Sequence, residues 1–103
     1  MSDALVLTPI DDKQGYRVLA ETPLLVLEEI VAHSGAAADK HSHDVQQIVY
    51  HLSGRFEVEV GDEVVDATAG TSYPINADVE HGSKCIEDGS YLIVYTKTGE
   101  AAG

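Results

Sequence analysis

Three histidines and a glutamine have the residue types and the spacing for metal binding. His41 and His43 lie two residues apart, Gln47 follows four residues later, and His81 comes after a strand, a turn and a strand. Residues of equal parity face one side of an extended strand, so His41, His43 and Gln47 are directed to the same side. Three imidazoles and an amide oxygen converging inside a barrel would bind a divalent first-row ion. Two alternatives remain: unrelated surface histidines, and a Gln47 that only hydrogen-bonds a histidine or the backbone.

The elements that must position these residues have the periodicity of β-strands. In the segment 55–60, RFEVEV, apolar residues alternate with charged ones, which places Phe56, Val58 and Val60 on one face. Further short strands are predicted in 15–21, 23–31, 45–53, 63–67, 71–75, 80–86 and 90–96. Turn signals separate them, among them Ser53-Gly54 and the segment 87–90, and a helical turn is expected around 36–39.

About seven or eight such strands predict an all-β protein, either a closed barrel or a double-sheet jelly roll. The first dozen residues and the segment 98–103 are expected to be loosely held ends. A chain of 103 residues with 44% hydrophobic residues supports one hydrophobic core, so a single domain over 1–103 is predicted.

The net charge of -12 argues against binding to nucleic acid or to an anionic membrane surface, because both are negative. It fits a solvated acidic surface or a salt-adapted host, and the sequence does not separate the two. The single cysteine, Cys85, excludes an intrachain disulfide, and no apolar stretch approaches the roughly 20 residues that span a bilayer. The first residues lack the basic and apolar regions of a signal peptide, so a cytoplasmic protein is expected.

The segment from Gly35 to Gly54 resembles the first motif of the cupin family, G-x5-H-x-H-x3,4-E-x6-G. Every spacing agrees, and only Gln47 replaces the glutamate. The segment from Gly70 resembles the second motif, G-x5-P-x-G-x2-H-x3-N, with His81 at the histidine position. The proline, glycine and asparagine positions of this motif hold Asn76, Asp78 and Cys85. Asparagine and aspartate tolerate the turn conformations that glycine supplies, so the loop is retained.

The resemblance covers roughly residues 15–97 and implies a double-stranded β-helix, the jelly-roll barrel of that family. It further implies one divalent metal ion, such as Zn, Ni, Fe, Mn or Co, held by His41, His43, Gln47 and His81. Gln46 is the second choice for the glutamine ligand, but its parity directs it outward. Small cupins commonly pair, which implies a homodimer, with the apolar segment 23–31 as a candidate edge strand.

A glutamine in place of glutamate changes the charge of such a site from about +1 to about +2. We therefore expect weaker metal binding and a stronger Lewis acid toward an anionic or carbonyl-bearing ligand. Oxidation of iron to the ferric state should be less favoured. Together these effects favour polarisation chemistry over redox cycling.

The same segment resembles a group of small cupins that open the ring of unsaturated uronates. Those enzymes carry an aspartate and then an aromatic residue in the last strand, followed by an arginine; here Ile93 and Tyr95 stand at the first two positions and no arginine follows. The acid/base group of that reaction is therefore missing. The remaining candidate catalytic residues are His51, which faces inward by parity and is otherwise a core histidine, and Tyr95 at the mouth of the barrel.

Three functions are compatible with these residues. The first is a metal-dependent isomerase, cyclase or lyase that acts on a small organic substrate bearing a carbonyl, enol or carboxylate group. The second is an iron-dependent dioxygenase. The third is a non-catalytic module that binds a small molecule or a sugar, which the missing aspartate favours.

Overall fold

The computed structural model describes residues 6–97, and within them every regular element is a β-strand. The strands are β1 (Thr8–Asp11), β2 (Gln14–Glu21), β3 (Leu25–Ala32), β4 (Ala37–His41), β5 (Gln47–Val60), β6 (Glu63–Ala67), β7 (Ser72–Ile75) and β8 (His81–Thr96). All pairings are antiparallel, in the order β1-β2-β3-β8-β5-β6, with β4 on β8 and β7 on β5. The predicted all-β jelly-roll barrel is confirmed.

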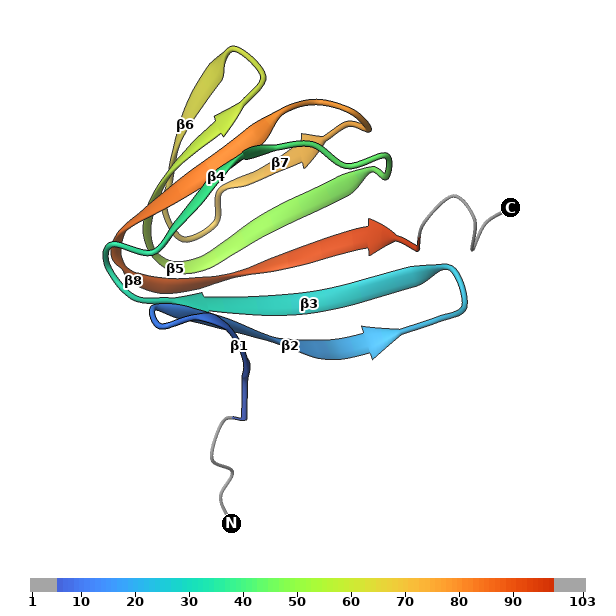
Figure 1. Cartoon of the computed structure of the whole chain (residues 1–103), viewed down its shortest axis with the longest axis horizontal. Coiled ribbons are helices and arrows are strands. Elements are labelled where there is room, and N and C mark those ends of the chain that lie inside the picture. The colour runs from blue at the N-terminus through green and yellow to red at the C-terminus, as the bar shows by residue number, and fades with distance from the viewer. Residues whose placement is uncertain (1–5, 98–103) are drawn as a thin grey trace.

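Two long strands join the two sides of the barrel. In Figure 1, β2 and β3 lie along one side and β4, β6 and β7 along the other, while β5 and β8 bend and continue from one side to the other. The sequence predicted separate strands and turns here, which is wrong: β5 runs for 14 residues through Gly54, and β8 for 16 residues through Gly89. The register between β5 and β8 shifts between His51 and Phe56, so the sheet bends without a loop.

Glycines permit this bend because the two backbones nearly touch. Gly54 has a φ of 78°, a left-handed value that a side chain disfavours. A Cβ atom on Gly54 would lie 2.5 Å from the carbonyl oxygen of Asp88, and one on Gly89 would overlap the backbone of Ser53. Both positions therefore require glycine.

The apolar face of the alternating strands forms the core. In β5, Val49, His51, Phe56 and Val58 are buried, while the residues between them are more exposed. Cys85 is also buried, and its thiol donates to the backbone oxygen of Glu87 at 3.1 Å. The cysteine is thus a packed core residue and lies away from the cavity described below.

Three further expectations from the sequence are corrected. The segment around 36–39 is not a helical turn, because Ala37–His41 pairs with β8 as β4. Thr8–Asp11 is strand β1 rather than a loose end, because it pairs with β2. The segment 23–31 is not an edge, since β3 lies between β2 and β8. The other residues expected to be loose, 1–5 and 98–103, lie outside the described residues. Within 6–97 no helix is long and apolar enough to cross a membrane.

Candidate metal centre

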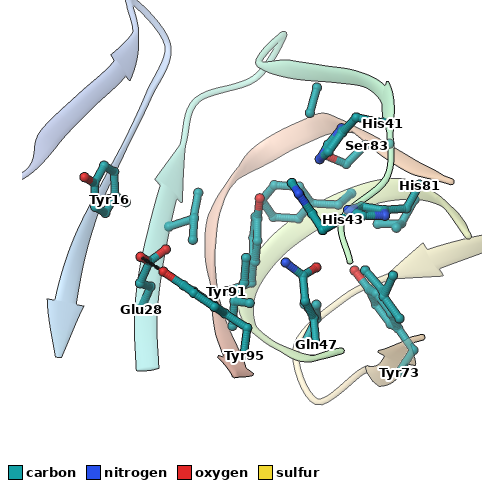
Figure 2. Close-up of a pocket in the computed structure, with 18 of the residues that line it drawn as sticks. Tyr16, Glu28, His41, His43, Gln47, Tyr73, His81, Ser83, Tyr91 and Tyr95 are labelled. Atoms are coloured by element: carbon teal, nitrogen blue, oxygen red, sulfur yellow. Dashed lines mark hydrogen bonds between the residues drawn. The ribbon is translucent and has the colours of Figure 1, made fainter. Parts of the chain in front are cut away.

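Strand pairing brings the three predicted histidines together. His41 ends β4 and His81 begins β8, and the two residues are paired directly across these strands. His43 lies in the following loop, whose position is fixed by a hydrogen bond from the backbone N–H of Asp78 to the carbonyl oxygen of His43 at 2.7 Å. Potential ligand atoms of the three histidines all lie within 4.8 Å of one another. Figure 2 shows the three rings gathered on one side of a cavity.

The loop before His81 confirms that aspartate can serve at a glycine position. Asp78 stands where the second motif has glycine, and its φ is 66°. Aspartate is among the few residues with a side chain that tolerate this left-handed conformation. The turn is therefore kept, and with it the hydrogen bond that ties the loop of His43 to the start of β8.

Two of the imidazoles are oriented as metal ligands by the backbone. The Nδ1 atom of His41 lies 2.7 Å from the carbonyl oxygen of Asp39, and that of His81 lies 3.0 Å from the carbonyl oxygen of Val79. A carbonyl oxygen only accepts, so Nδ1 carries the proton and donates it. The lone pair of a neutral imidazole is then on Nε2, and such hydrogen bonds commonly orient metal-binding histidines.

The third imidazole is biased toward its neutral form. Partial burial, and then the neighbouring His41 and His81, lower the pKa of His43, against an opposing effect of Asp44. A neutral imidazole is the form that binds a metal ion. The donor set and its protonation therefore fit a divalent ion of the kind expected from the sequence.

Gln47 shares the cavity with the histidines. It begins β5 between Ile75 of β7 and Tyr95 of β8, and it lines the same cavity as His41, His43 and His81. Figure 2 shows its amide pointing toward the histidines. Gln46 is exposed and does not line the cavity, as its parity predicted.

The cavity has a volume of about 570 Å³, which is in the range that accommodates a small organic ligand. The polar histidine cluster occupies one part of it. Most of the wall is aliphatic or aromatic, and includes Ile30, Val49, Phe56, Val58, Ile75, Tyr91 and Ile93.

His51 lies in the interior, as predicted. It is 1% exposed, and its Nε2 atom lies 2.9 Å from the hydroxyl of Tyr73. Burial lowers the pKa of His51 to about 4, so the imidazole is neutral at pH 7. Its buried Nδ1 atom has no hydrogen-bond partner among the described residues. The catalytic role of His51 remains a prediction.

Tyr95 also lines the cavity, and it has a partner that the sequence analysis missed. Its hydroxyl donates to Oε2 of Glu28 at 2.6 Å, and Figure 2 shows the two side chains meeting. Burial, followed by the hydrogen bond and charge of Glu28, raises the pKa of the Tyr95 phenol. Glu28 follows Val26 and precedes Ile30 at the same parity, so strand alternation places it on their face of β3. Leu27 and Val31 flank Glu29 in the same way, so the sequence does not show which of the two faces is inward.

Lys40, in contrast, lies outside the cavity. It is exposed, and its Nζ atom is 4.0 Å from a carboxylate oxygen of Glu59. Its ammonium group therefore lies at the surface beside Glu59.

Comparison with known proteins identifies the class to which this fold and site belong. Residues 27–96 match the sequence profile of the cupin domain, and the chain therefore belongs to the cupin family. No curated protein matches the sequence.

Solved structures share the fold over nearly the whole chain. KdgF from Halomonas sp. is 23% identical with a TM-score of 0.85, over 93% of this chain and 90% of that protein. An RmlC-like cupin from Shewanella frigidimarina is 24% identical with a TM-score of 0.86, over 95% and 88% of the two chains. The polyketide cyclase RemF from Streptomyces resistomycificus is 18% identical with a TM-score of 0.74, over 93% and 80%. At these identities the likeness concerns the fold.

Proposed function

We propose that this cupin is a metal-dependent enzyme that acts on a small organic substrate through a carbonyl, enol or carboxylate oxygen. The observation that carries the proposal is the orientation of the histidines. The Nδ1 atoms of His41 and His81 face backbone carbonyl oxygens, and the three histidines meet at the wall of a cavity of about 570 Å³. His41, His43, His81 and Gln47 would hold one divalent ion, which when bound supplies Lewis-acid polarisation of the substrate oxygen.

The side chains of the cavity favour redox-neutral chemistry. The amide of Gln47 adds no negative charge to the cluster, so the site retains the positive charge that polarises an oxygen. Most of the cavity wall is apolar, and His51, which is neutral at pH 7, faces the same space. Isomerisation, cyclisation and elimination need these properties and no external oxidant.

The ring-opening reaction of unsaturated uronates is not carried over to this chain. KdgF shares the fold at 23% identity, but Ile93 stands at the aspartate position of the ring-opening group. The side chain of Ile93 lines the cavity and can neither accept nor donate a proton. The proposal is therefore limited to the reaction class.

Elemental analysis of the purified protein, incubated with zinc and then desalted, tests the proposal. We expect about one ion per chain in the wild type, and at least roughly tenfold weaker binding in His81→Ala, because one of three oriented imidazoles is lost. His33→Ala is the matched control, since His33 is an exposed histidine that contacts Asp88 outside the cluster. Equal metal content in wild type and His81→Ala, or none in the wild type, would contradict the proposal.

A further inference from the structure

A carboxylate stands on the otherwise apolar inner face of β3. Val26 and Ile30, at the same parity, are 7% and 4% exposed, and Glu28 between them lines the cavity. Withdrawing a carboxylate from water is costly unless it receives hydrogen bonds. The hydroxyl of Tyr95 donates one at 2.6 Å and thereby fixes the orientation of the Glu28 side chain.

The register of the sheet relates Glu28 to Gln47, which shares the cavity with the histidines. Glu28 pairs with Ile93 of β8, and Ile93 pairs with Val49 of β5, so these residues form one row across three strands. Gln47 and Tyr95 form the neighbouring inward row. Inward rows of a sheet are about 7 Å apart along the strands, a span that a small molecule bridges. A carboxylate thus stands beside Ile93, the residue at the aspartate position of the ring-opening group.

The charge of the cavity restricts the ligand. No lysine or arginine lines the cavity within residues 6–97, and the charged side chains of its wall are the carboxylates of Glu28 and Asp44. His51 is neutral at pH 7. Away from the proposed ion, a negatively charged part of the ligand would therefore face Glu28 without a cationic side chain. An uncharged apolar part would contact Val49, Phe56 and other apolar residues of the wall.

We propose that Glu28 is a catalytic base of the cavity, held in position by Tyr95, and that the substrate is an uncharged, enolisable carbonyl compound with an apolar body. The inference rests on the proposed metal-dependent function and adds the base and the substrate class to it. The Glu28 carboxylate takes a proton from the carbon beside the carbonyl group. The C–H electron pair becomes the C=C bond and the carbonyl π pair moves to oxygen. When Glu28 returns a proton to carbon, the C=C pair forms the new C–H bond and the oxygen pair restores the carbonyl group. A proton that Glu28 has exchanged with water gives isotope exchange at the same carbon, and a proton delivered to the far carbon of a conjugated enolate gives an isomer; neither consumes another reactant.

The first test concerns the ligand class and uses metal-free protein at pH 8. The two probes are 4-phenylbutan-2-one and 3-phenylpropanoate. The ketone has a methyl group where the carboxylate has its charged oxygen. Ligand-observed NMR measures the dissociation constant of each probe. We expect the wild type to bind the ketone at least about tenfold more tightly, and Glu28→Gln to bring the two probes within about threefold. Equal affinities in the wild type, or an unchanged ratio in Glu28→Gln, would overturn the proposed substrate class.

The second test concerns proton transfer and uses zinc-loaded protein in D₂O. NMR measures the rate at which 4-phenylbutan-2-one takes up deuterium on the carbons beside its carbonyl group. Glu28→Gln should slow the exchange about 100-fold, the usual order for loss of a general base. Tyr95→Phe should lower the maximal rate with little change in the half-saturating ketone concentration, because Tyr95 positions the base. Glu29→Gln is the matched control: this neighbouring carboxylate pairs with Arg17, does not line the cavity and should leave the rate unchanged.

The outcomes separate this inference from the metal proposal. If zinc binds but the wild type exchanges no faster than Glu28→Gln, or than zinc alone, the role of Glu28 is wrong and the metal site stands. If zinc does not bind, the proposed function is wrong, and the metal-free comparison of the two probes still decides whether Glu28 selects an uncharged ligand.

Discussion

At the residue scale, Gln47 gives the histidine cluster its unusual neutrality. The four side chains of the proposed metal site are His41, His43, His81 and Gln47, and they carry no negative charge when the imidazoles are neutral. Each property expected of the bound ion depends on this feature, from its affinity to its strength as a Lewis acid.

Gln47→Glu should therefore bind zinc at least about tenfold more tightly than the wild type, because a carboxylate adds charge to an otherwise neutral ligand set. The same variant should polarise a bound carbonyl group less. Affinity is measured by competition with a chromophoric chelator. Gln46→Glu introduces the same charge one residue away on an exposed side chain and should change the affinity less than twofold. Equal gains in the two variants would mean that Gln47 does not contact the ion.

The sequence predicts which residues lie together in the cavity wherever a family motif and strand parity agree. His41, His43 and His81 needed only the spacing of two motifs, and the structure brings them together. Glu28 was missed because parity assigns residues to two faces without saying which face is inward. That choice depends on the partners of β3: the apolar segment 23–31 predicts an edge strand, whereas β2 and β8 enclose it.

At the element scale, the bends of β5 and β8 create the barrel that contains the site. Residues before Gly54 carry Gln47 and His51 into the cavity, and residues after it contribute Phe56 to the core. The sequence signals at Ser53-Gly54 and in the segment 87–90 predict turns between separate strands. Glycine favours a hairpin and a bend equally, so only the long-range pairing of β5 with β8 distinguishes them.

Gly89→Ala should destabilise the protein by at least about 3 kcal/mol or prevent its folding. The new methyl group would overlap the backbone of Ser53 and Gly54, and a backbone cannot move aside as a side chain can. Urea unfolding measures the loss. Gly70→Ala is the control: Gly70 has a φ of 91° but no atom within 4 Å of the new methyl group, so only backbone strain of about 1–2 kcal/mol is expected. Similar losses in both variants would show that the close crossing of β5 and β8 does not decide stability.

At the scale of the whole molecule, an outward row of apolar side chains crosses the sheet. Leu27, Val94, Ile48 and Pro74 are neighbours in register across β3, β8, β5 and β7. Ile48 is 59% exposed in the single chain, and Tyr50, at the same parity, is 45% exposed. The chain carries a net charge of -12, so two copies repel each other wherever their acidic surfaces meet. The uncharged row across β3, β8, β5 and β7 is a surface through which they can approach with little repulsion.

We propose that a second copy of the chain covers this row and forms a homodimer. The sequence predicts a homodimer through a free edge strand; here the interface is the outward face of the sheet instead. Ile48→Asp should then convert the protein from twice the mass of one chain to a monomer in light scattering after size exclusion, since a carboxylate would be buried without a partner. Val64→Asp adds the same charge on β6 at a residue that is 64% exposed, outside the row, and should leave the dimer intact. A monomeric wild type at about 100 μM, or equal dissociation of both variants, would contradict the proposal, because a stable pair of standard interface size persists at that concentration.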